Sequence, residues 1–426
     1  MIKIPRVTEG RLEGEWSNNV KTFNWELIIL LWLVFFFNQA DRQIFNVILP
    51  LIKIDLGLSD GELGLIASVF IWAIGLCVPL AGYVGDVFDK KKVIIFSLLL
   101  WSTATFFTGL STGLLHLVFL RAIVGSSESF YAPAANALIG EKYKEQRGFA
   151  MSIHQTALYI GVIMSGLIGA LIAENFGWST AFYFFGAIGI ILSFILFFRF
   201  KKLILSQFSE VSNPVTLWDG IRWLFQKRTA ILLTLAFACM VFVNVGYLTW
   251  APTFLHEKFS LSLANAGFSS MFYHHIFAFF GVLAGGRFSD KLAKKSLAAR
   301  LKIQAFGLLL GCPFIFLLGY TNDLFWVYAG MGLFGFFRGI YDSNIYASLY
   351  TVIAPRIRAS VSGAMIMFAF LMGAFAPLIL GALKPTLGLS YGLSSLSLAY
   401  FTGSIFIFIA IKYTLFKELY SESTES

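Results

Sequence analysis

Long apolar runs separated by short charged segments divide the chain into twelve segments. A helix needs about 20 consecutive apolar residues to cross a bilayer. The runs lie at 24–49, 63–84, 93–111, 114–140, 149–173, 179–200, 229–256, 265–288, 301–320, 323–352, 359–383 and 391–415. They lack the alternation of apolar and polar residues that is typical of membrane barrel strands. The pattern therefore predicts an all-α integral membrane protein with twelve transmembrane helices.

Composition agrees, since 13% of the residues are charged, against about 25% in soluble proteins. Lysine and arginine divide unevenly between the two sides that the runs define. With the N-terminus inside, 26 of the 32 Lys and Arg residues lie in cytoplasmic segments, and three lie opposite: Lys53, Lys258 and Lys384. Cytoplasmic segments of membrane proteins carry such an excess. We therefore expect a multi-pass protein of the cell (inner) membrane with both termini cytoplasmic. The net charge of +9 then reflects topology and contact with membrane lipid, not nucleic-acid binding.

The two halves of the chain echo each other. GYVGDVFDKKK follows the second run and GRFSDKLAKK the eighth, while EKYKEQRGFAMS follows the fourth and APRIRASVSGAM the tenth. Repeat-built secondary transporters show such internal similarity. The predicted organisation is a cytoplasmic N-terminus, a six-helix bundle, a cytoplasmic central loop, a second six-helix bundle and a cytoplasmic tail: 1–23, 24–200, 201–228, 229–415 and 416–426. Within the central loop, LWDGIRWLFQKR is predicted to be an amphipathic helix on the membrane surface.

The repeated loops contain candidate gating residues. Gly82 allows two helices to approach closely, and Asp86 can bind helix N-terminal amides or a basic partner. Pseudo-symmetry pairs Asp86 with the region of Arg358, and Asp290 with that of Arg147. We expect these contacts to latch the cytoplasmic side; the alternative is ordinary solvated loop charge. Gly82 and Asp86, followed by Lys90 and Lys91 between the second and third of twelve spans, resemble the signature loop of the major facilitator superfamily.

Away from the ends of the apolar runs lie six acidic or strongly basic residues: Asp41, Arg42, Arg121, Glu128, Arg338 and Asp342. Each costs about 2.5 to 3.5 kcal/mol at the centre of a membrane helix, and such residues usually mark a substrate or ion path. The alternative is three structural ion pairs, which fits Arg338 and Asp342 best because they are one helical turn apart.

Fully ionised, the six charges cancel. Protonation of Asp41 and Glu128 would leave Arg42 and Arg121 free to bind an organic carboxylate through bidentate contacts. The adjacent acid and base of the first span are therefore predicted to form a switch, in which a proton controls the affinity for an anion.

A DR pair in the first span and R-x6-E in the fourth are similar to the anion:cation symporters, which include sugar-acid:proton symporters and sialin. The resemblance implies that Arg42 and Arg121 bind the substrate carboxylate and that Asp41 and Glu128 handle protons. It implies as substrate a small organic anion, such as a hexuronate, aldonate or sialic acid. LIASVFIWAIGLCVPLAGYVGDVF also resembles Spinster-type transporters, which implies the alternative of a lysolipid cargo.

Further polar residues within the runs favour a small, hydrated ligand over a lipid. The substrate-site candidates besides Arg42 and Arg121 are Gln43, Gln155, Tyr159, Asn244, Tyr247, His274, Arg338, Tyr341 and Asn344. No HExxH, GxSxG or phosphate-loop motif is present, so we expect no enzyme activity, cofactor or metal. A channel would not need coupled acid–base pairs. We expect a monomer that transports by alternating access.

Overall fold

The computed structural model describes residues 23–202 and 217–419, apart from the side chains at 86, 201, 202 and 217. Most of the predicted N-terminal segment, much of the central loop and the end of the tail lie outside these residues. So does the side chain of Asp86, which belongs to the predicted latch.

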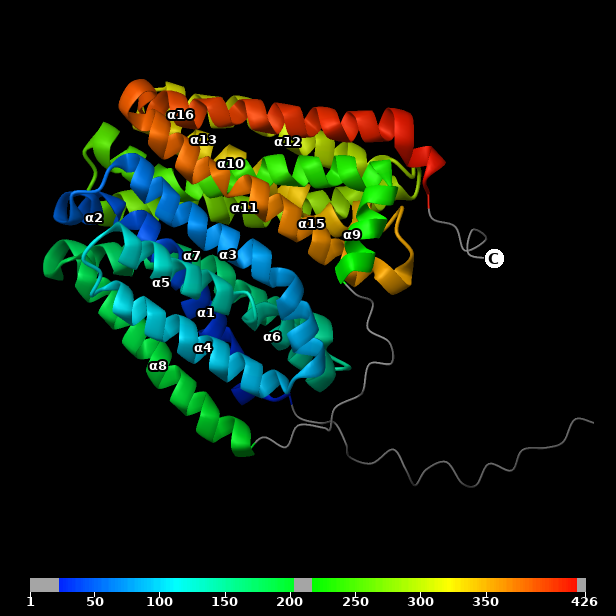
Figure 1. Ribbon diagram of the computed structural model, residues 1–426. Coiled ribbons are helices and arrows are strands. Elements are labelled where there is room, and N and C mark those ends of the chain that lie inside the picture. Colours follow the sequence, from blue (N-terminus) through cyan, green and yellow to red (C-terminus); the bar gives the residue numbers. More distant parts are fainter. Residues whose placement is uncertain (1–22, 203–216, 420–426) are drawn as a thin grey trace, which may run out of the picture.

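The described chain is helical, as predicted, and its helices form two halves (Figure 1). The first half comprises α1 (Trp25–Val47), α2 (Leu49–Leu56), α3 (Asp60–Val87), α4 (Lys90–Thr108), α5 (Leu114–Glu128), α6 (Tyr131–Lys142), α7 (Arg147–Phe176) and α8 (Trp178–Lys202). The second comprises α9 (Leu217–Gln226), α10 (Arg228–Phe259), α11 (Leu263–Ala293), α12 (Ala299–Tyr320), α13 (Leu324–Asp342), α14 (Ile345–Leu349), η1 (Pro355–Ile357), α15 (Arg358–Gly373), α16 (Phe375–Ile409), η2 (Ala410–Thr414) and η3 (Leu415–Lys417).

Ten segments of the described chain are long and apolar enough to cross a membrane. Two features reconcile this number with twelve passes. The segment Pro355–Lys417 crosses twice, because α16 reverses direction at Gly388, whose φ of +72° is easily adopted only by a residue without a side chain. The fourth pass is divided into α5 and α6, each shorter than a membrane-spanning helix.

The fourth and tenth passes break at equivalent places. In the first half, α5 ends at Glu128 and α6 begins at Tyr131; in the second, α13 ends at Asp342 and α14 begins at Ile345. Both breaks therefore follow directly after an acidic residue. Irregular backbone at membrane depth is tolerated where it is buried in protein or lines a cavity, so the two breaks indicate where a binding site lies.

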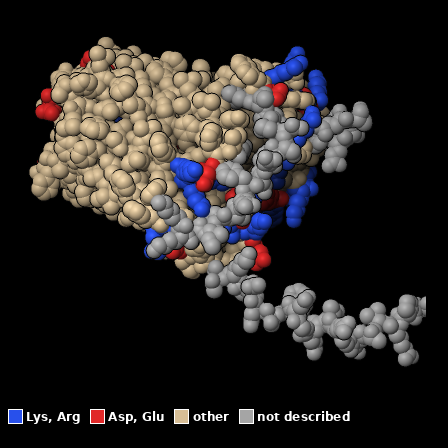
Figure 2. All heavy atoms as spheres, turned by 60° about the horizontal axis from the view of Figure 1, so that its bottom comes forward, with Lys and Arg blue, Asp and Glu red and all other residues tan. Residues whose placement is uncertain are grey.

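The halves have two distinct ends. We call the end at which α1 begins and α16 finishes the terminal end, and the opposite end, near α2, the far end (Figure 1). Lys and Arg side chains gather over the terminal end, whereas the middle of the molecule shows almost no charge (Figure 2). This distribution is the one expected if the terminal end is cytoplasmic. Helix α9 confirms the predicted helix in the central loop, and its Gly220 packs against the backbone of Ser360 on α15.

Glycines bring the halves into backbone contact. A Cβ atom on Gly166 of α7 would come within 2.6 Å of the carbonyl oxygen of Gly267 on α11. One on Gly64 of α3 would overlap the carbonyl of Pro377 on α16. Small residues allow such close approach between membrane helices. The axes of the two halves diverge from this region toward the terminal end (Figure 1).

An ion-pair network closes the far end. Lys384 of α16 lies 2.9 Å from Asp60 of α3 and 2.6 Å from Glu257 of α10, while Asp60 also lies 2.7 Å from Lys53 of α2. The bond between Lys384 and Asp60 is the link that crosses between the halves. We call these four residues the far gate.

We predict that Lys384→Gln weakens closure of the far end. Loss of a hydrogen bond between charged groups costs about 1.5 to 3 kcal/mol, which should shift the population of far-open molecules by roughly tenfold or more. The readout is labelling of a cysteine at Thr249, in the central cavity, by an impermeant thiol reagent added to the far side, with the native cysteines replaced.

Lys258→Gln is the matched control. Lys258 is also at the far end, but its ammonium donates to the carbonyls of Gly319 and Thr321 in its own half. Equal labelling rates in the two variants would show that the far gate does not hold the end closed.

Candidate functional site

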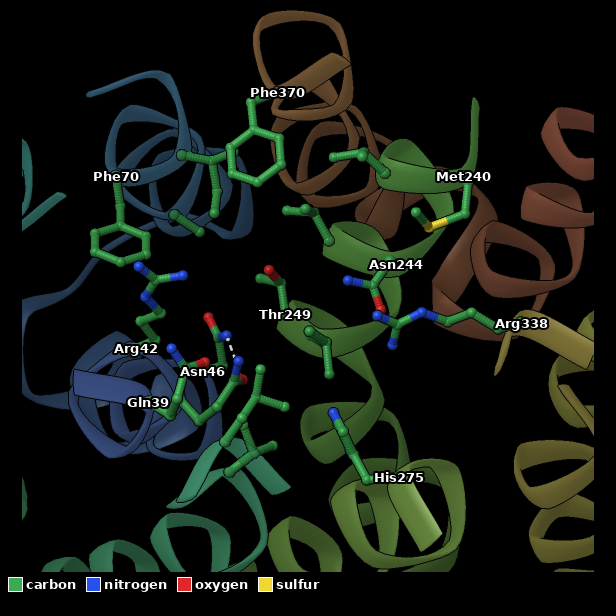
Figure 3. A pocket seen from close by; sticks show the side chains of 18 of the residues that line it. Gln39, Arg42, Asn46, Phe70, Met240, Asn244, Thr249, His275, Arg338 and Phe370 are labelled. Atoms are coloured by element: carbon green, nitrogen blue, oxygen red, sulfur yellow. Dashed lines mark hydrogen bonds between the residues drawn. The ribbon is translucent and has the colours of Figure 1, made fainter. Parts of the chain in front are cut away.

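A cavity of about 440 Å³ lies between the halves, within the range of about 300 to 1,000 Å³ for small-molecule sites. Helix α1 supplies one wall with Gln39, Arg42, Gln43 and Asn46. These positions follow the spacing i, i+3, i+4, i+7, so they share one helix face. Figure 3 shows Gln39, Arg42 and Asn46 facing Asn244, Thr249 and Arg338 across the cavity.

An ion pair connects the cavity to a buried acid. Nε of Arg42 donates to Oε2 of Glu128 over 2.6 Å. The Arg42 side chain is 24% exposed, whereas that of Glu128 is fully buried. Glu128 does not line the cavity itself. Its link to the cavity is Arg42, and Glu128 is the last residue of α5.

Arg121 also lines the cavity and lies on the same helix as Glu128. Its guanidinium stacks on the ring of Phe45 at 4.2 Å, and Nη1 contacts the backbone carbonyl of Asp41 at 3.5 Å. No described carboxylate lies within ion-pair distance of Arg121, and its Nε and Nη2 atoms are buried without a partner. Arg121 therefore keeps unused hydrogen-bond donors at the cavity, although Glu128 and Asp41 are near enough to interact with its charge.

Asp41 lies on the other face of α1. Its side chain is 1% exposed, Oδ2 accepts a hydrogen bond from Thr105 of α4 at 3.3 Å, and Oδ1 has no partner. Asp41 does not line the cavity. The neighbouring residues Asp41 and Arg42 thus point to different surroundings, because successive positions on a helix diverge by about 100°.

The second half contributes a different arrangement of charge. Nε of Arg338 lies 3.3 Å from Oδ2 of Asp342, one turn further along α13. Nη1 of Arg338 lies 2.8 Å from Nε2 of His274. Because guanidinium can only donate, Nε2 accepts and the His274 ring is neutral. Arg338 and Asp342 both line the cavity, whereas His274 is fully buried behind them.

His275 is a cavity residue that sequence reasoning missed. Its Nδ1 lies 2.9 Å from the carbonyl oxygen of Met271 and so donates to it, which leaves Nε2 as an acceptor. The ring points into the cavity (Figure 3). Asn46 was missed as well, although the spacing from Gln39 to Asn46 could have revealed it.

The other substrate-site candidates separate into two groups. Gln43 and Asn244 line the cavity. The other six do not line it. Gln155 is exposed, Tyr341 is buried, and Tyr159 packs against His275 and Phe279. The remaining three form hydrogen bonds within the protein: Tyr247 donates to the carbonyl of Ser270, His274 accepts from Arg338, and Asn344 accepts from Ser289.

Of the two predicted latch pairs, the structure describes both side chains only for Asp290 and Arg147, and these two do not form an ion pair. Asp290 lies 3.5 Å from Arg300 of its own half, and Arg358 lies over the ring of Tyr350. The guanidinium of Arg147 would touch a Cβ atom at Gly140, while a Cβ atom at Gly82 would meet nothing within 4 Å. The pairing of Asp86 with the region of Arg358 lies outside the described side chains, so the latch stays a prediction.

Two six-helix halves that share a charged cavity at their interface are the architecture of a secondary transporter. The chain belongs to the Major Facilitator Superfamily, whose family model matches residues 31–377. It is therefore a multi-pass membrane transporter and not an enzyme.

Curated relatives and a solved structure agree. The chain is 26% identical to the probable galactarate/D-glucarate transporter GudP of Escherichia coli K12, over 85% of this chain and 87% of the relative. It is 26% identical to the D-galactonate transporter of Escherichia coli O6:H1, over 89% and 93%. A bacterial homologue of the human lysosomal transporter Spinster superposes with a TM-score of 0.83 at 20% identity, covering 95% of this chain and all of the other. At that identity the likeness shows the fold alone.

We predict that Arg42 and Glu128 are coupled in their contributions to the stability of the protein. Arg42→Met leaves a buried carboxylate without its partner, a change that costs about 3 to 5 kcal/mol when both groups are buried and less here because Arg42 reaches the cavity. Thermal unfolding in detergent should show a larger loss for Arg42→Met than for Arg121→Met, since Arg121 contacts a backbone carbonyl and aromatic rings but forms no ion pair with a described carboxylate.

Adding Glu128→Gln should restore much of the stability of Arg42→Met, because the orphaned charge is removed. The same addition should not help Arg121→Met. If Glu128→Gln affects both variants alike, the pairing between Arg42 and Glu128 is not the one that matters.

Proposed function

We propose that the protein is a proton-coupled symporter of a small organic anion, a sugar acid such as a hexuronate, an aldonate or sialic acid. The observation that carries this proposal is the buried Arg121 guanidinium, which lines the cavity without a carboxylate partner, beside the ion pair of Arg42 and Glu128. The similarity to transporters of D-galactonate and of galactarate/D-glucarate supports a sugar acid as the substrate class.

The ion pair provides the coupling. Protonation of Glu128 removes the charge that holds Nε of Arg42, so that the Arg42 guanidinium becomes available to the cavity. A substrate carboxylate then binds between Arg42 and Arg121. Binding of one proton and one carboxylate leaves the net charge of the site unchanged. The loaded protein therefore changes conformation without an excess charge inside the membrane, which would be costly. Asp41, buried behind α1, is the candidate for a second proton.

The polar wall of α1, together with Asn244, Thr249 and His275 across the cavity, suits a hydrated ligand with many hydrogen-bonding groups. A lysolipid, the alternative cargo, would leave these groups unpaired against its acyl chain. In the proposed cycle the protein works as a monomer in the cell membrane, with both termini cytoplasmic. The far gate closes the outer side, and the latch around Asp86 and Arg358 closes the inner side in the opposite conformation.

Glu128→Gln should separate exchange from coupling. The amide keeps the shape of the protonated acid, so we expect binding and counterflow exchange of D-galactonate in proteoliposomes to survive, while accumulation driven by a pH gradient is lost. Glu62→Gln is the control: Glu62 is a partly exposed acid of the same half that caps α3 with Ser59, and glutamine preserves that capping. Uptake by Glu128→Gln that still responds fully to the pH gradient would refute this assignment.

Arg121→Lys should fail although the charge is kept. An ammonium offers neither the planar pair of donors that matches a carboxylate nor the stacking on Phe45. Loss of a hydrogen bond between charged groups weakens binding by roughly 10- to 150-fold. Calorimetry with D-galactonate measures the effect, with Arg199→Lys, an exposed ion-paired arginine, as the control. Affinity close to that of the unchanged protein would make Arg121 a structural residue and move the anion site to Arg42 or Arg338.

A further inference from the structure

The two halves place an arginine–acid pair at the cavity in different ways. In both, the acid ends a helix just before a break: Glu128 at the end of α5 and Asp342 at the end of α13. Glu128, however, pairs with Arg42 of another helix, whereas Asp342 pairs with Arg338 of its own helix, four residues away. A movement between helices can separate the first pair but leaves the second intact.

The second-half pair is also held from behind. Nη1 of Arg338 donates to the neutral ring of His274, and His274 is wedged against the rings of Tyr247 and Phe334. The Arg338 and Asp342 side chains are 17% and 25% exposed, so both present part of their surface to the cavity. This wall of the cavity therefore offers hydrogen-bonding groups whose charges already cancel.

The wall from the first half differs because it contains a cation, Arg121, that forms no ion pair with a described carboxylate. Arg121 has no described carboxylate within ion-pair distance, and Arg42 loses its own on protonation of Glu128. With Glu128 protonated and Asp41 ionised, Arg42, Arg121 and Asp41 together leave one positive charge, so one substrate carboxylate is compensated on this side. A second carboxylate, at the opposite end of the ligand, would lie against a cation that Asp342 has already neutralised, inside a membrane where an uncompensated charge is costly.

We infer that the pair of Arg338 and Asp342 makes the cavity selective for a polyhydroxylated monocarboxylate over the corresponding dicarboxylate. Asp342 is the specificity-determining residue, and the substrate lies with its carboxylate toward α1 and α5 and its hydroxyl groups toward α13. This inference rests on the proposed function, because it assumes that a sugar acid occupies the cavity.

The test uses two probes with the same six-carbon chain, D-galactonate with one carboxylate and galactarate with two. Both are fully ionised near pH 6, about two units above the usual pKa of a carboxyl group. Affinities are measured by calorimetry on purified protein whose folding is checked by gel filtration. We expect the unchanged protein to bind galactonate at least about tenfold more tightly than galactarate, as one uncompensated charge would require.

Two substitutions should change the ratio of the galactonate affinity to the galactarate affinity in opposite directions. Asp342→Asn releases Arg338 for a second carboxylate, so the ratio should fall below about threefold, mainly through tighter galactarate binding. Arg338→Gln leaves Asp342 unpaired in the cavity, so the ratio should rise. A merely structural role would weaken both ligands together. Asp323→Asn, which removes an exposed acid of the same helix but keeps an N-cap, should leave the ratio unchanged.

The outcomes distinguish this inference from the function on which it rests. Binding of neither probe would overturn both. Binding of galactarate as tightly as galactonate by the unchanged protein would overturn the selectivity and leave the sugar-acid function standing. A galactonate preference that Asp342→Asn does not alter would show that another group excludes the second carboxylate.

Discussion

The ion pair between Arg42 and Glu128 lies inside a membrane protein, where a charge without a partner is expensive. It joins α1 to the broken end of α5 and so connects the cavity to an acid that the cavity cannot reach directly. This contact has one role in the empty protein and another in the proposed transport cycle. In the empty protein it gives one oxygen of a buried carboxylate, Oε2 of Glu128, a charged partner, whereas Oε1 has none. In the proposed cycle the transported carboxylate takes over the role of Glu128 once a proton has neutralised it. The stacked guanidinium of Arg121 is ready beside it for the same carboxylate.

The far gate shows a related arrangement of charges at the far end. Its central bond joins Lys384 to Asp60 across the halves, but each of these residues keeps a second partner in its own half, Glu257 and Lys53 respectively. When the halves separate, each carries away a complete ion pair, so no charge is left alone. Opening then breaks the bond between Lys384 and Asp60, the bond that the backbone N–H of Leu263 donates to Glu174 across the halves, and the glycine-mediated packing beside them, but it does not isolate the charges of Lys384 and Asp60. This arrangement allows a tight closure that remains reversible.

Much of the site could be recognised in the sequence, because charged residues in apolar runs are rare and their cost is independent of the details of packing. Arg42, Arg121 and Arg338 were candidates on these grounds, and all three line the cavity. Among the uncharged candidates, Gln43 and Asn244 line it as well. Uncharged polar residues were harder to place. A tyrosine or asparagine within a span is equally suited to a hydrogen bond between helices, and the structure gives Tyr247 and Asn344 such bonds to Ser270 and Ser289.

The sequence alone determined the class of fold, the number of passes, the asymmetry of charge between the two ends and the repetition of the halves. These properties depend on local hydrophobicity and on the order of segments, which can be read without knowing how helices pack. Only the tertiary structure decided which partner each buried charge has. Glu128 and Arg121 share a helix, yet Glu128 pairs with Arg42 of α1, because the rotation of α1 and the break after α5 set which side chains meet. Such pairings depend on angles and distances between helices far apart in the chain, and no spacing within one helix encodes them.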